Sequence, residues 1–441
     1  MFPQKKSVFM KKRYWWRSWS RLALWSHVVG VIGFYCVLWW RTFPRKEDRL
    51  KILPPFAETH TSAFAQDDQA TTSTLPFISI IVPARNEEFN IRRCVRSLLE
   101  QDYGHYEVVV VDDGSTDHTA ELLDELALNH PHGDRLWVLQ LRDELPPGWA
   151  GKPHAIHSGV QEANGNWFLF TDADTWHAPN ALRSAITQAI DEHVDMFTLG
   201  AEQELPTFWD RVLMPMAYLG ISMLYPPRLV NDPASPLAVA NGQYILLRRE
   251  VYERLGGYDR PQMRDTLLDD RDLAALVKSN GYILRFIDSD GLVHVHMYRD
   301  LSAIWRGWRK NSYLGNRGGL LFVLLELFGL PMITVVPFLL PLLYRLLRLG
   351  KNAPVSACEA TVATTLEMVP LLSYRVWLNN QLHVPWYYAL THPLAGAFFE
   401  GILGQSMWRV LTKRGVDWSG RVYHNGHAKK SSVNAKVESP R

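Results

Sequence analysis

The stretch that decides the fold is Asn166-Trp167-Phe168-Leu169-Phe170-Thr171-Asp172-Ala173-Asp174-Thr175. Its apolar run, residues 167–170, is short and unbroken, which is typical of a strand buried on both faces of a sheet. The run ends at two carboxylates one residue apart, Asp172 and Asp174. Ligands of open α/β sheets bind beyond the carboxyl ends of the strands. Two hard oxygen ligands there suit Mg²⁺ or Mn²⁺ carrying a diphosphate, with a solvated loop as the alternative for this motif taken alone.

Strands and helices alternate on both sides of this stretch. Apolar runs of strand length lie at 77–82, 106–111, 136–141, 167–170 and 196–201. Apolar residues at helical spacing predict helices over 91–99, 119–128 and 180–193. The alternation predicts an α/β fold, with a mostly parallel sheet and right-handed crossovers. Farther along, we expect a strand pair over 237–247 around Asn241-Gly242-Gln243, and a helix over 249–258 that closes on Gly256-Gly257.

The composition indicates a chain that meets lipid. Seventeen tryptophans and a hydrophobic content of 47% fit such a chain, because Trp and Tyr settle at membrane interfaces. The net charge of +2 gives no field that would favour nucleic acid as a partner. Cys36, Cys94 and Cys358 follow no metal or redox spacing, so a reducing compartment is compatible with the sequence.

An apolar run near the N-terminus has the composition of a membrane anchor. Residues 22–40 are interrupted only by Ser26 and His27, and they approach the length that spans a bilayer. The run ends in Trp39-Trp40-Arg41 without a small-residue cleavage site, which favours an anchor over a signal peptide. Basic residues stand on both sides of the run, so the positive-inside rule gives no orientation.

Further apolar stretches lie beyond residue 200. The stretch 208–229 contains Pro215, and we expect it to form a helix on the membrane surface, with a single span as the alternative. Two or three more spans are expected near the C-terminus, from the stretches 320–344, 355–378 and 386–411. Residues 57–74 lack periodicity and predict a flexible linker, and residues 427–441 predict disorder.

Four groups of polar residues lie at predicted strand or helix ends. Asp112-Asp113-Gly114-Ser115 follows a strand, where an acid can accept from a nucleoside, although Asp112 or Asp117 can simply cap the next helix. Lys152, in the loop 148–152, can offset diphosphate charge or be surface decoration. Asp269, Asp270 and Asp272 precede a helix expected over 273–277, and one of them could accept a proton. The cationic stretch 305–311 can bind phosphate or anchor at an interface.

These motifs, in this order over about residues 76–315, resemble the family 2 glycosyltransferases of GT-A fold. The matching residues are Pro83-Ala84-Arg85-Asn86-Glu87, Asp112-Asp113-Gly114-Ser115-Thr116-Asp117, Asp172-Ala173-Asp174 and Asp269-Asp270. Residues 145–152 and 209–233 are similar to hopene-associated glycosyltransferases. Asn241-Gly242-Gln243, 296–299 and 307–311 are more similar to membrane carotenoid glycosyltransferases, and residues 418–423 to the tail of both groups.

The resemblance implies an inverting, metal-dependent transfer from a nucleotide-diphospho-sugar to a hydroxyl of a membrane lipid, such as a carotenoid, a hopanoid, another isoprenoid or a glycolipid. Asp270 would be the base, with Asp272 as its rival, and Asp172 and Asp174 would hold Mg²⁺ or Mn²⁺. The donor would lie against Pro83, Ala84, Glu87, Asp113, Lys152 and Asp172. The acceptor or phosphate would meet Gly242, Gln243, Trp308, Arg309 and Lys310.

Two departures from the family pattern limit this interpretation. The family's Glu-Asp pair is Asp269-Asp270 here, and the Gln-x-x-Arg-Trp motif of polymerising members is absent, which argues against processive polysaccharide synthesis. A nucleotidyltransferase, which would release pyrophosphate, and a non-catalytic membrane scaffold are the alternatives.

Composition and resemblance together give a domain plan and a location. The expected parts are a basic segment and anchor over 1–51, a linker over 52–75, a GT-A catalytic domain over 76–319, transmembrane helices over 320–412 and a basic tail over 413–441. We expect a multi-pass protein of the cell's cytoplasmic membrane, with the catalytic domain in the cytoplasm, where nucleotide sugars are made. The basic residues of 1–21 conflict with this orientation if 22–40 spans once, whereas a hairpin or interfacial helix removes the conflict.

Overall fold

The computed structural model describes residues 4–43, 75–314, 319–348, 355–412, 416–418, 421–424 and 427–428. The chain divides into a helical unit, residues 1–43, 205–224 and 300–408, and an α/β unit, residues 44–204, 225–299 and 409–441. This division differs from the continuous catalytic range 76–319 that we expected, because residues 205–224 and 300–314 belong to the helical unit. The expected linker over 57–74 and the expected disorder over 427–441 fall almost wholly outside the described residues.

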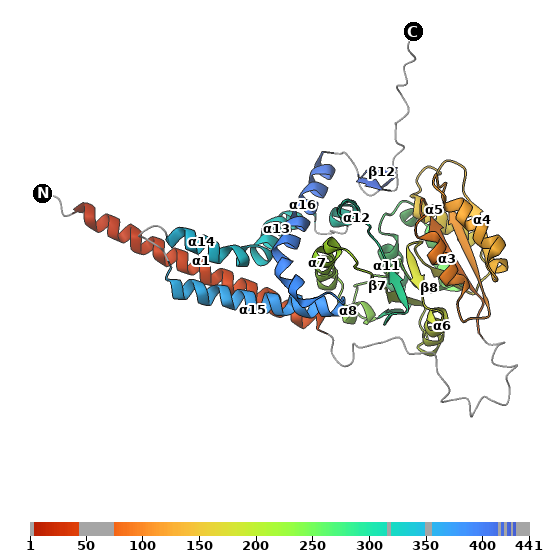
Figure 1. The fold of residues 1–441 in the computed structure, drawn as a ribbon, viewed down its shortest axis with the longest axis horizontal. Coiled ribbons are helices and arrows are strands. Elements are labelled where there is room, and N and C mark those ends of the chain that lie inside the picture. Colours follow the sequence, from red (N-terminus) through yellow and green to blue (C-terminus); the bar gives the residue numbers. More distant parts are fainter. Residues whose placement is uncertain are drawn as a thin grey trace, which may run out of the picture. The chain divides into compact units, whose positions relative to one another are not determined.

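A seven-stranded sheet forms the centre of the α/β unit, in the order β3-β2-β1-β4-β8-β6-β9. Figure 1 draws the strands of the chain as arrows and its helices as coiled ribbons. Its strands are β1 (Ile78–Ala84), β2 (Tyr106–Asp112), β3 (Leu136–Gln140), β4 (Trp167–Phe170), β6 (Met196–Gly200), β8 (Ile245–Arg248) and β9 (Leu284–Asp288). The strands β3, β2, β1 and β4 run parallel, whereas β8 is antiparallel to both β4 and β6. The fold is therefore α/β with a mostly parallel sheet, as the alternation predicts.

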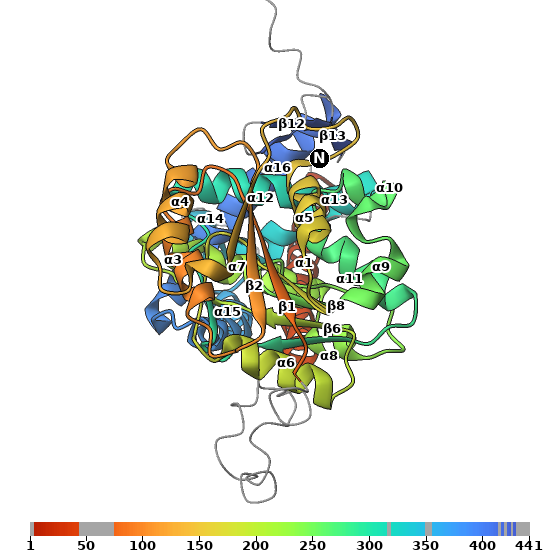
Figure 2. The same cartoon turned by 90° about the vertical axis from the view of Figure 1, so that its right-hand side faces the viewer.

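Helices cover both faces of this sheet (Figure 2). In β1, Ile80 and Val82 pack on one side with α3 (Ile91–Leu99), α4 (Thr119–Asn129) and α6 (Ala181–Asp191). Ile81, one residue along, packs on the other side with α5 (Gly151–Glu162), α9 (Arg249–Leu255) and α11 (Asp269–Ser279). Because alternate residues point to opposite faces, a strand covered on both sides must be apolar throughout. This is why the strands appear in the sequence as unbroken apolar runs.

Shorter elements complete the α/β unit. They are α8 (Pro227–Asn231), α10 (Pro261–Arg264), the 3₁₀ helices η2 (Gly133–Arg135) and η3 (Gly257–Asp259), a sheet of β5 (Thr175–His177), β10 (Val293–Val295) and β7 (Glu202–Gln203), and a sheet of β11 (Val416–Trp418), β12 (Arg421–His424) and β13 (His427–Ala428).

Two local predictions for this unit are wrong. Residues 237–244 form no strand, so the expected pair over 237–247 reduces to β8. The segment instead runs as a loop that is held by side chains, with the amide N–H of Asn241 donating to Thr198 Oγ1 at 2.9 Å. In addition, α11 begins at Asp269 and not at Leu273, so its three acids lie in the first turn, where the helix dipole stabilises them.

The helical unit contains the apolar stretches. Its elements are α1 (Gln4–Thr42), α7 (Phe208–Leu224), α12 (Leu301–Leu314), α13 (Gly319–Thr334), α14 (Val336–Arg348), α15 (Ala357–Gln381), η4 (Trp386–Thr391) and α16 (His392–Leu411). The stretch 208–229 ends as a helix at Leu224, because Pro226 and Pro227 follow. Within α7, Pro215 has no N–H for the carbonyl of Arg211. The buried Arg375 side chain donates to the neighbouring carbonyl of Val212 at 2.9 Å and lies 3.5 Å from that of Arg211.

A proline also divides the expected span 320–344 into α13 and α14. Pro337 cannot donate to the carbonyl of Ile333, and the helix restarts at Val336. Side chains of α1 bond to the carbonyls at the break: Tyr35 Oη donates to Ile333 at 3.4 Å, and His27 Nε2 lies 2.8 Å from the carbonyl oxygen of Met332. Within the described residues, Ser18–Thr42 is the one helix that is long and apolar enough to cross a membrane by length and composition.

Candidate active site

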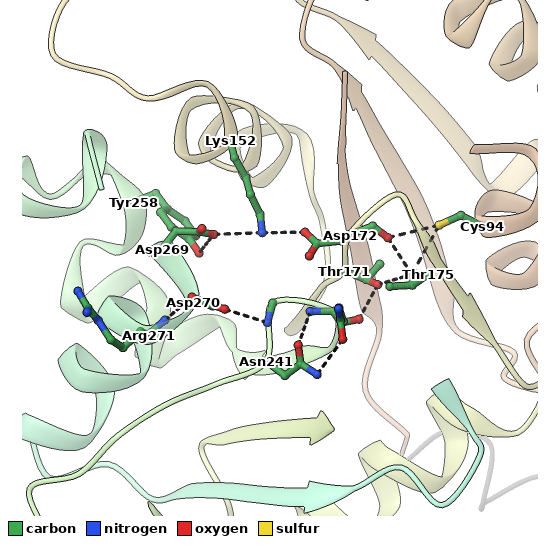
Figure 3. A network of polar contacts seen from close by, with 12 residues as sticks. Cys94, Lys152, Thr171, Asp172, Thr175, Asn241, Tyr258, Asp269, Asp270 and Arg271 are labelled. Carbon is green, nitrogen blue, oxygen red and sulfur yellow. Dashed lines mark hydrogen bonds and ion pairs between the residues drawn. The ribbon is translucent and has the colours of Figure 1, made fainter. Parts of the chain in front are cut away.

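Lys152 forms ion pairs with two carboxylates near the carboxyl end of β4. It lies in the first turn of α5, and its Nζ is 2.7 Å from Oδ1 of Asp172 and 3.4 Å from Oδ2 of Asp269 (Figure 3). Burial by itself would favour the neutral amine, but the field of Asp172, Asp269 and Asp270 raises the pKa of Lys152 above its ordinary value. Lys152 is therefore a fixed cation that fits an anionic phosphate group.

Local packing explains why Lys152 lies at this point. Trp149, shortly before it in the chain, is buried and stacks on His157, with ring centroids 5.0 Å apart. The N–H of Ala150 donates to the carbonyl of Arg264 at 2.7 Å. These two contacts fix the chain just ahead of α5, so the first turn of the helix holds Lys152 at the site.

A glycine on α5 lets this helix lie close against the sheet. A Cβ at Gly159 would lie 2.8 Å from Ile81 Cγ2 of β1 and 2.9 Å from Val111 Cγ2 of β2. Real Cβ atoms do not approach side chains this closely, so a larger residue would push α5 outward and move Lys152 with it.

Asp270 lies beside Gly242 in the same network. Its Oδ1 accepts from the N–H of Arg271 at 2.7 Å, and its Oδ2 accepts from the N–H of Gly242 at 3.3 Å (Figure 3). Burial, followed by the charge of Asp269, raises the pKa of Asp270 to about 6. A carboxylate with a pKa near neutrality can accept a proton at physiological pH and release it again.

Asp272, the rival base, has its carboxylate bound within its own segment. Its Oδ2 accepts from Thr266 Oγ1 at 2.6 Å, and its Oδ1 pairs with the Arg271 guanidinium at 2.9 Å. These partners favour a structural role for Asp272 and leave Asp270 as the acid that faces Gly242.

Three charged groups lie close to Gly242. A Cβ at residue 242 would lie 3.2 Å from Lys152 Nζ and 3.5 Å from both Asp172 Oδ2 and Asp270 Oδ2. Gln243, by contrast, has a buried side chain whose Oε1 accepts from Asn241 Nδ2 at 3.0 Å. Its backbone carbonyl accepts from Thr171 Oγ1 at 2.8 Å. The contacts of Gln243 thus fix the loop, and its contact with acceptor or phosphate stays a prediction.

Asp172 and Asp174, the carboxylates expected to hold a metal, are separated by one residue in the chain. Among the described residues they are not part of a complete set of metal ligands. Asp174 Oδ1 is buried and has no hydrogen-bond partner among the described residues. Burial, and then the charges of Asp172 and Glu87, raises the pKa of Asp174 well above its ordinary value. Among the described residues, no group of three His, Cys, Asp or Glu side chains has the geometry of a metal site. Asp172 and Asp174 nevertheless fit a hard divalent cation that takes its other ligands from water or diphosphate.

The residues expected to bind the nucleoside lie at the carboxyl ends of β1 and β2 or just beyond them. Pro83 and Ala84 end β1, and the carbonyl of Ala84 accepts from the N–H of Asp113 at 2.9 Å. The Asp113 carboxylate lies 3.6 Å from the Arg85 guanidinium. Glu87 accepts from Asn90 Nδ2 at 2.8 Å, and burial raises its pKa.

The neighbouring acids stabilise turns. Asp112 Oδ1 accepts from the N–H of Ser115 at 2.9 Å, and Asp117 accepts from the N–H and Oγ1 of Thr119 at the start of α4. Different residues of this motif can therefore perform the two roles that the sequence predicts for it, helix capping and nucleoside binding.

Trp308, Arg309 and Lys310 lie on α12 of the helical unit, not in the α/β unit that contains the site. Arg309 is buried, its guanidinium lies 3.4 Å from Gln405 Oε1, and its carbonyl accepts from Ser406 Oγ at 2.8 Å. Trp308 packs edge-on against Phe399. The side chain of Lys310 lies outside the described residues.

Tyr258 was not singled out from the sequence, and Tyr298 was noted only as part of the stretch 296–299, without a role. Tyr258 Oη donates to Asp269 Oδ2 at 3.3 Å. Tyr298 is buried, and burial together with the charge of Asp174 raises its pKa. Tyr258 follows Gly256-Gly257, which the sequence marks only as a helix end, so the pattern carried no signal for this role.

Comparison with known proteins shows which families and structures the chain resembles. Residues 79–256 match the model for Glycosyl transferase family 2. A 4,4'-diaponeurosporenoate glycosyltransferase of Staphylococcus aureus is 26% identical over 378 residues, which cover 82% of this chain and 92% of that protein. Among solved structures, a mannosyltransferase from Pyrobaculum calidifontis in complex with GDP-Man and Mn²⁺ is 20% identical with a TM-score of 0.49, covering 88% of this chain and 98% of that one.

Proposed function

The chain is a glycosyltransferase of family 2, and we propose that it transfers a sugar from a nucleotide-diphospho-sugar to a carotenoid-type or other isoprenoid lipid of the membrane. The observation that carries this proposal is the arrangement around Gly242, where one ammonium and two carboxylates come together at the carboxyl end of β4. A leaving diphosphate needs the cation, and an incoming acceptor needs the base.

The proposed reaction breaks the bond between the anomeric carbon and the diphosphate oxygen and forms a bond from that carbon to the acceptor oxygen. Attack from the opposite face inverts the anomeric configuration. Asp270 takes the proton of an acceptor hydroxyl, and Lys152 lies beside the departing diphosphate. Glu87 and Asp113 bind the nucleoside. A divalent cation, Mg²⁺ or Mn²⁺, held by Asp172 and Asp174, would supply Lewis-acid stabilisation of the leaving group.

The acceptor atom has two chemical possibilities. The Staphylococcus aureus relative is named for a carboxylate, and a carboxylate acceptor is already ionised and gives an ester without a base. A hydroxyl acceptor gives a glycoside and requires that its proton be removed. Asp270, whose pKa is raised to about 6, supports the hydroxyl. A second carboxylate beside Asp270 would be repelled.

The test follows a labelled sugar from the donor into lipid. Membranes containing the protein are incubated with Mn²⁺, apolar lipids and each of UDP-glucose, UDP-galactose, UDP-N-acetylglucosamine and GDP-mannose carrying a radiolabelled sugar. We expect label in the organic phase together with free UDP or GDP, whereas release of pyrophosphate would identify a nucleotidyltransferase. Label that survives mild alkali indicates a glycoside, and label lost under mild alkali indicates an ester. Lipid profiling of a deletion strain then identifies the natural acceptor.

We further propose that the protein lies in the cytoplasmic membrane as a multi-pass protein with its α/β unit in the cytoplasm. The helix Ser18–Thr42 supports membrane association by its length and composition, and Trp15, Trp19 and Trp40 expose large aromatic side chains along α1. Protease cleavage within residues 57–74 in sealed inverted vesicles is the expected result. Cleavage only in right-side-out vesicles would contradict the cytoplasmic placement.

A further inference from the structure

Contacts within residues 252–258 hold Tyr258 rigidly beside Asp269. Gly256 ends α9 in the left-handed region, and a Cβ at Gly257 would lie 2.1 Å from the ring of Tyr252. The N–H of Tyr258 donates to Tyr252 Oη at 3.1 Å, and the Tyr258 ring packs edge-on against Phe170 with centroids 6.0 Å apart. Because the ring is fully buried and its backbone is fixed, the direction of its hydroxyl is fixed as well.

That hydroxyl meets the carboxylate oxygen that also contacts Lys152. Asp269 Oδ2 lies 3.3 Å from Tyr258 Oη and 3.4 Å from Lys152 Nζ, and the same Nζ lies 2.7 Å from Asp172 Oδ1 (Figure 3). The ammonium thus contacts two carboxylates, and it lies closer to Asp172 than to Asp269. A hydrogen bond to a buried carboxylate satisfies part of its charge and fixes its rotamer. Without the hydroxyl, Lys152 would be the remaining side-chain partner of the Asp269 carboxylate among the described residues, and Asp269 would compete more strongly for it.

We infer that Tyr258 is a positioning residue: through Asp269, it sets how far Lys152 reaches toward Asp172 and hence toward the diphosphate of the donor. The inference rests on the proposed function, because it assigns Lys152 to the diphosphate. Tyr258 itself touches Asp269 and the neighbouring rings, so its role is to orient Lys152 and not to meet the substrate.

The test compares two Tyr→Phe variants from the same aromatic cluster. Tyr258→Phe removes the hydroxyl that bonds to Asp269, and Tyr252→Phe removes a buried hydroxyl whose bond goes to the backbone of residue 258. For Tyr258→Phe we expect the dissociation constants of UDP and GDP, measured by calorimetry with Mn²⁺, and the donor KM to rise about 10-fold, equivalent to about 1.4 kcal/mol, while kcat changes less than about 3-fold. Tyr252→Phe should lower the melting temperature and leave both constants near wild type.

Three results would overturn the inference. They are unchanged nucleotide binding in Tyr258→Phe, an equal loss in both variants, and a loss in kcat with unchanged KM. A wild-type protein that binds UDP and GDP but transfers no sugar would refute the proposed function while leaving the binding comparison decisive for Tyr258. A wild-type protein that binds neither nucleotide would overturn both.

Discussion

The Nζ of Lys152 lies 2.7 Å from Oδ1 of Asp172, although the lysine belongs to α5 and the aspartate follows β4. The contact means that a basic group and a proposed metal ligand share one small space. It also means that Lys152 neutralises negative charge of Asp172 that a bound metal ion would otherwise neutralise. The predictions below separate these contributions.

Asp174→Ala should abolish transfer without unfolding the protein. The Asp174 carboxylate has a buried oxygen without a hydrogen-bond partner in the described part of the chain, so its removal should not disrupt packing. Loss of a metal ligand should cost several kcal/mol of transition-state stabilisation, and hence at least about 100-fold in rate.

The measurements for this variant are transfer with Mn²⁺ supplied, Mn²⁺ binding by electron paramagnetic resonance, and the melting temperature. The matched control is Asp124→Ala, an exposed acid on α4. Retention of about a tenth of the wild-type activity by Asp174→Ala would rule out the metal role.

Asp270→Asn should leave nucleotide binding nearly unchanged and lower turnover by at least about 100-fold, because the amide cannot accept the acceptor's proton. Asp272→Asn should mainly lower stability, by about 1–3 kcal/mol, since it weakens bonds to Thr266 and Arg271. Turnover and thermal unfolding of the two variants decide between them. Reversed phenotypes would make Asp272 the base.

The pH profile of kcat/KM should show an acid limb with a midpoint of about 6, because burial and Asp269 raise the pKa of Asp270 to that value. The base acts when ionised, so activity is full above this pKa and falls about tenfold per pH unit below it. The profile is measured with a saturating acceptor between about pH 4.5 and 8, which brackets the ordinary and the raised pKa of an aspartate. A limb near pH 4, the ordinary range of an aspartate, would contradict the assignment of Asp270.

Gly242→Ala should block transfer while the protein folds normally. The added methyl would stand 3.2–3.5 Å from Lys152, Asp172 and Asp270, in the position proposed for substrate, and the backbone of Gly242 is not in the left-handed region. We expect at least about a tenfold loss in kcat/KM with an unchanged melting temperature, equivalent to about 1.4 kcal/mol. The control is Gly104→Ala, where the new Cβ meets no atom within 4 Å. Full activity in Gly242→Ala would place the reaction elsewhere.

The sequence predicts most of the α/β unit because its signals are local. Strands β1, β2, β3, β4 and β6 and helices α3, α4 and α6 lie within two residues of the ranges expected from apolar periodicity. The two failures have different causes, one in tertiary contacts and one in the local sequence. Residues 237–244 are apolar enough for a strand, yet Asn241 and Gly242 bond to side chains of other elements and not to a neighbouring strand. Residues 320–344 are apolar enough for one span, yet Pro337 divides them.

The sequence by itself determined the positions of the strands, the acids at their ends and the likeness to a sugar-transferring family, since each of these depends on neighbours along the chain. Only the tertiary structure decided which of these acids act together. Asp270 faces Gly242 whereas Asp272 bonds to Thr266, and Tyr258 reaches Asp269. These pairings depend on how α5 and α11 pack on one face of the sheet, and side-chain directions there are set by contacts between residues far apart in the sequence.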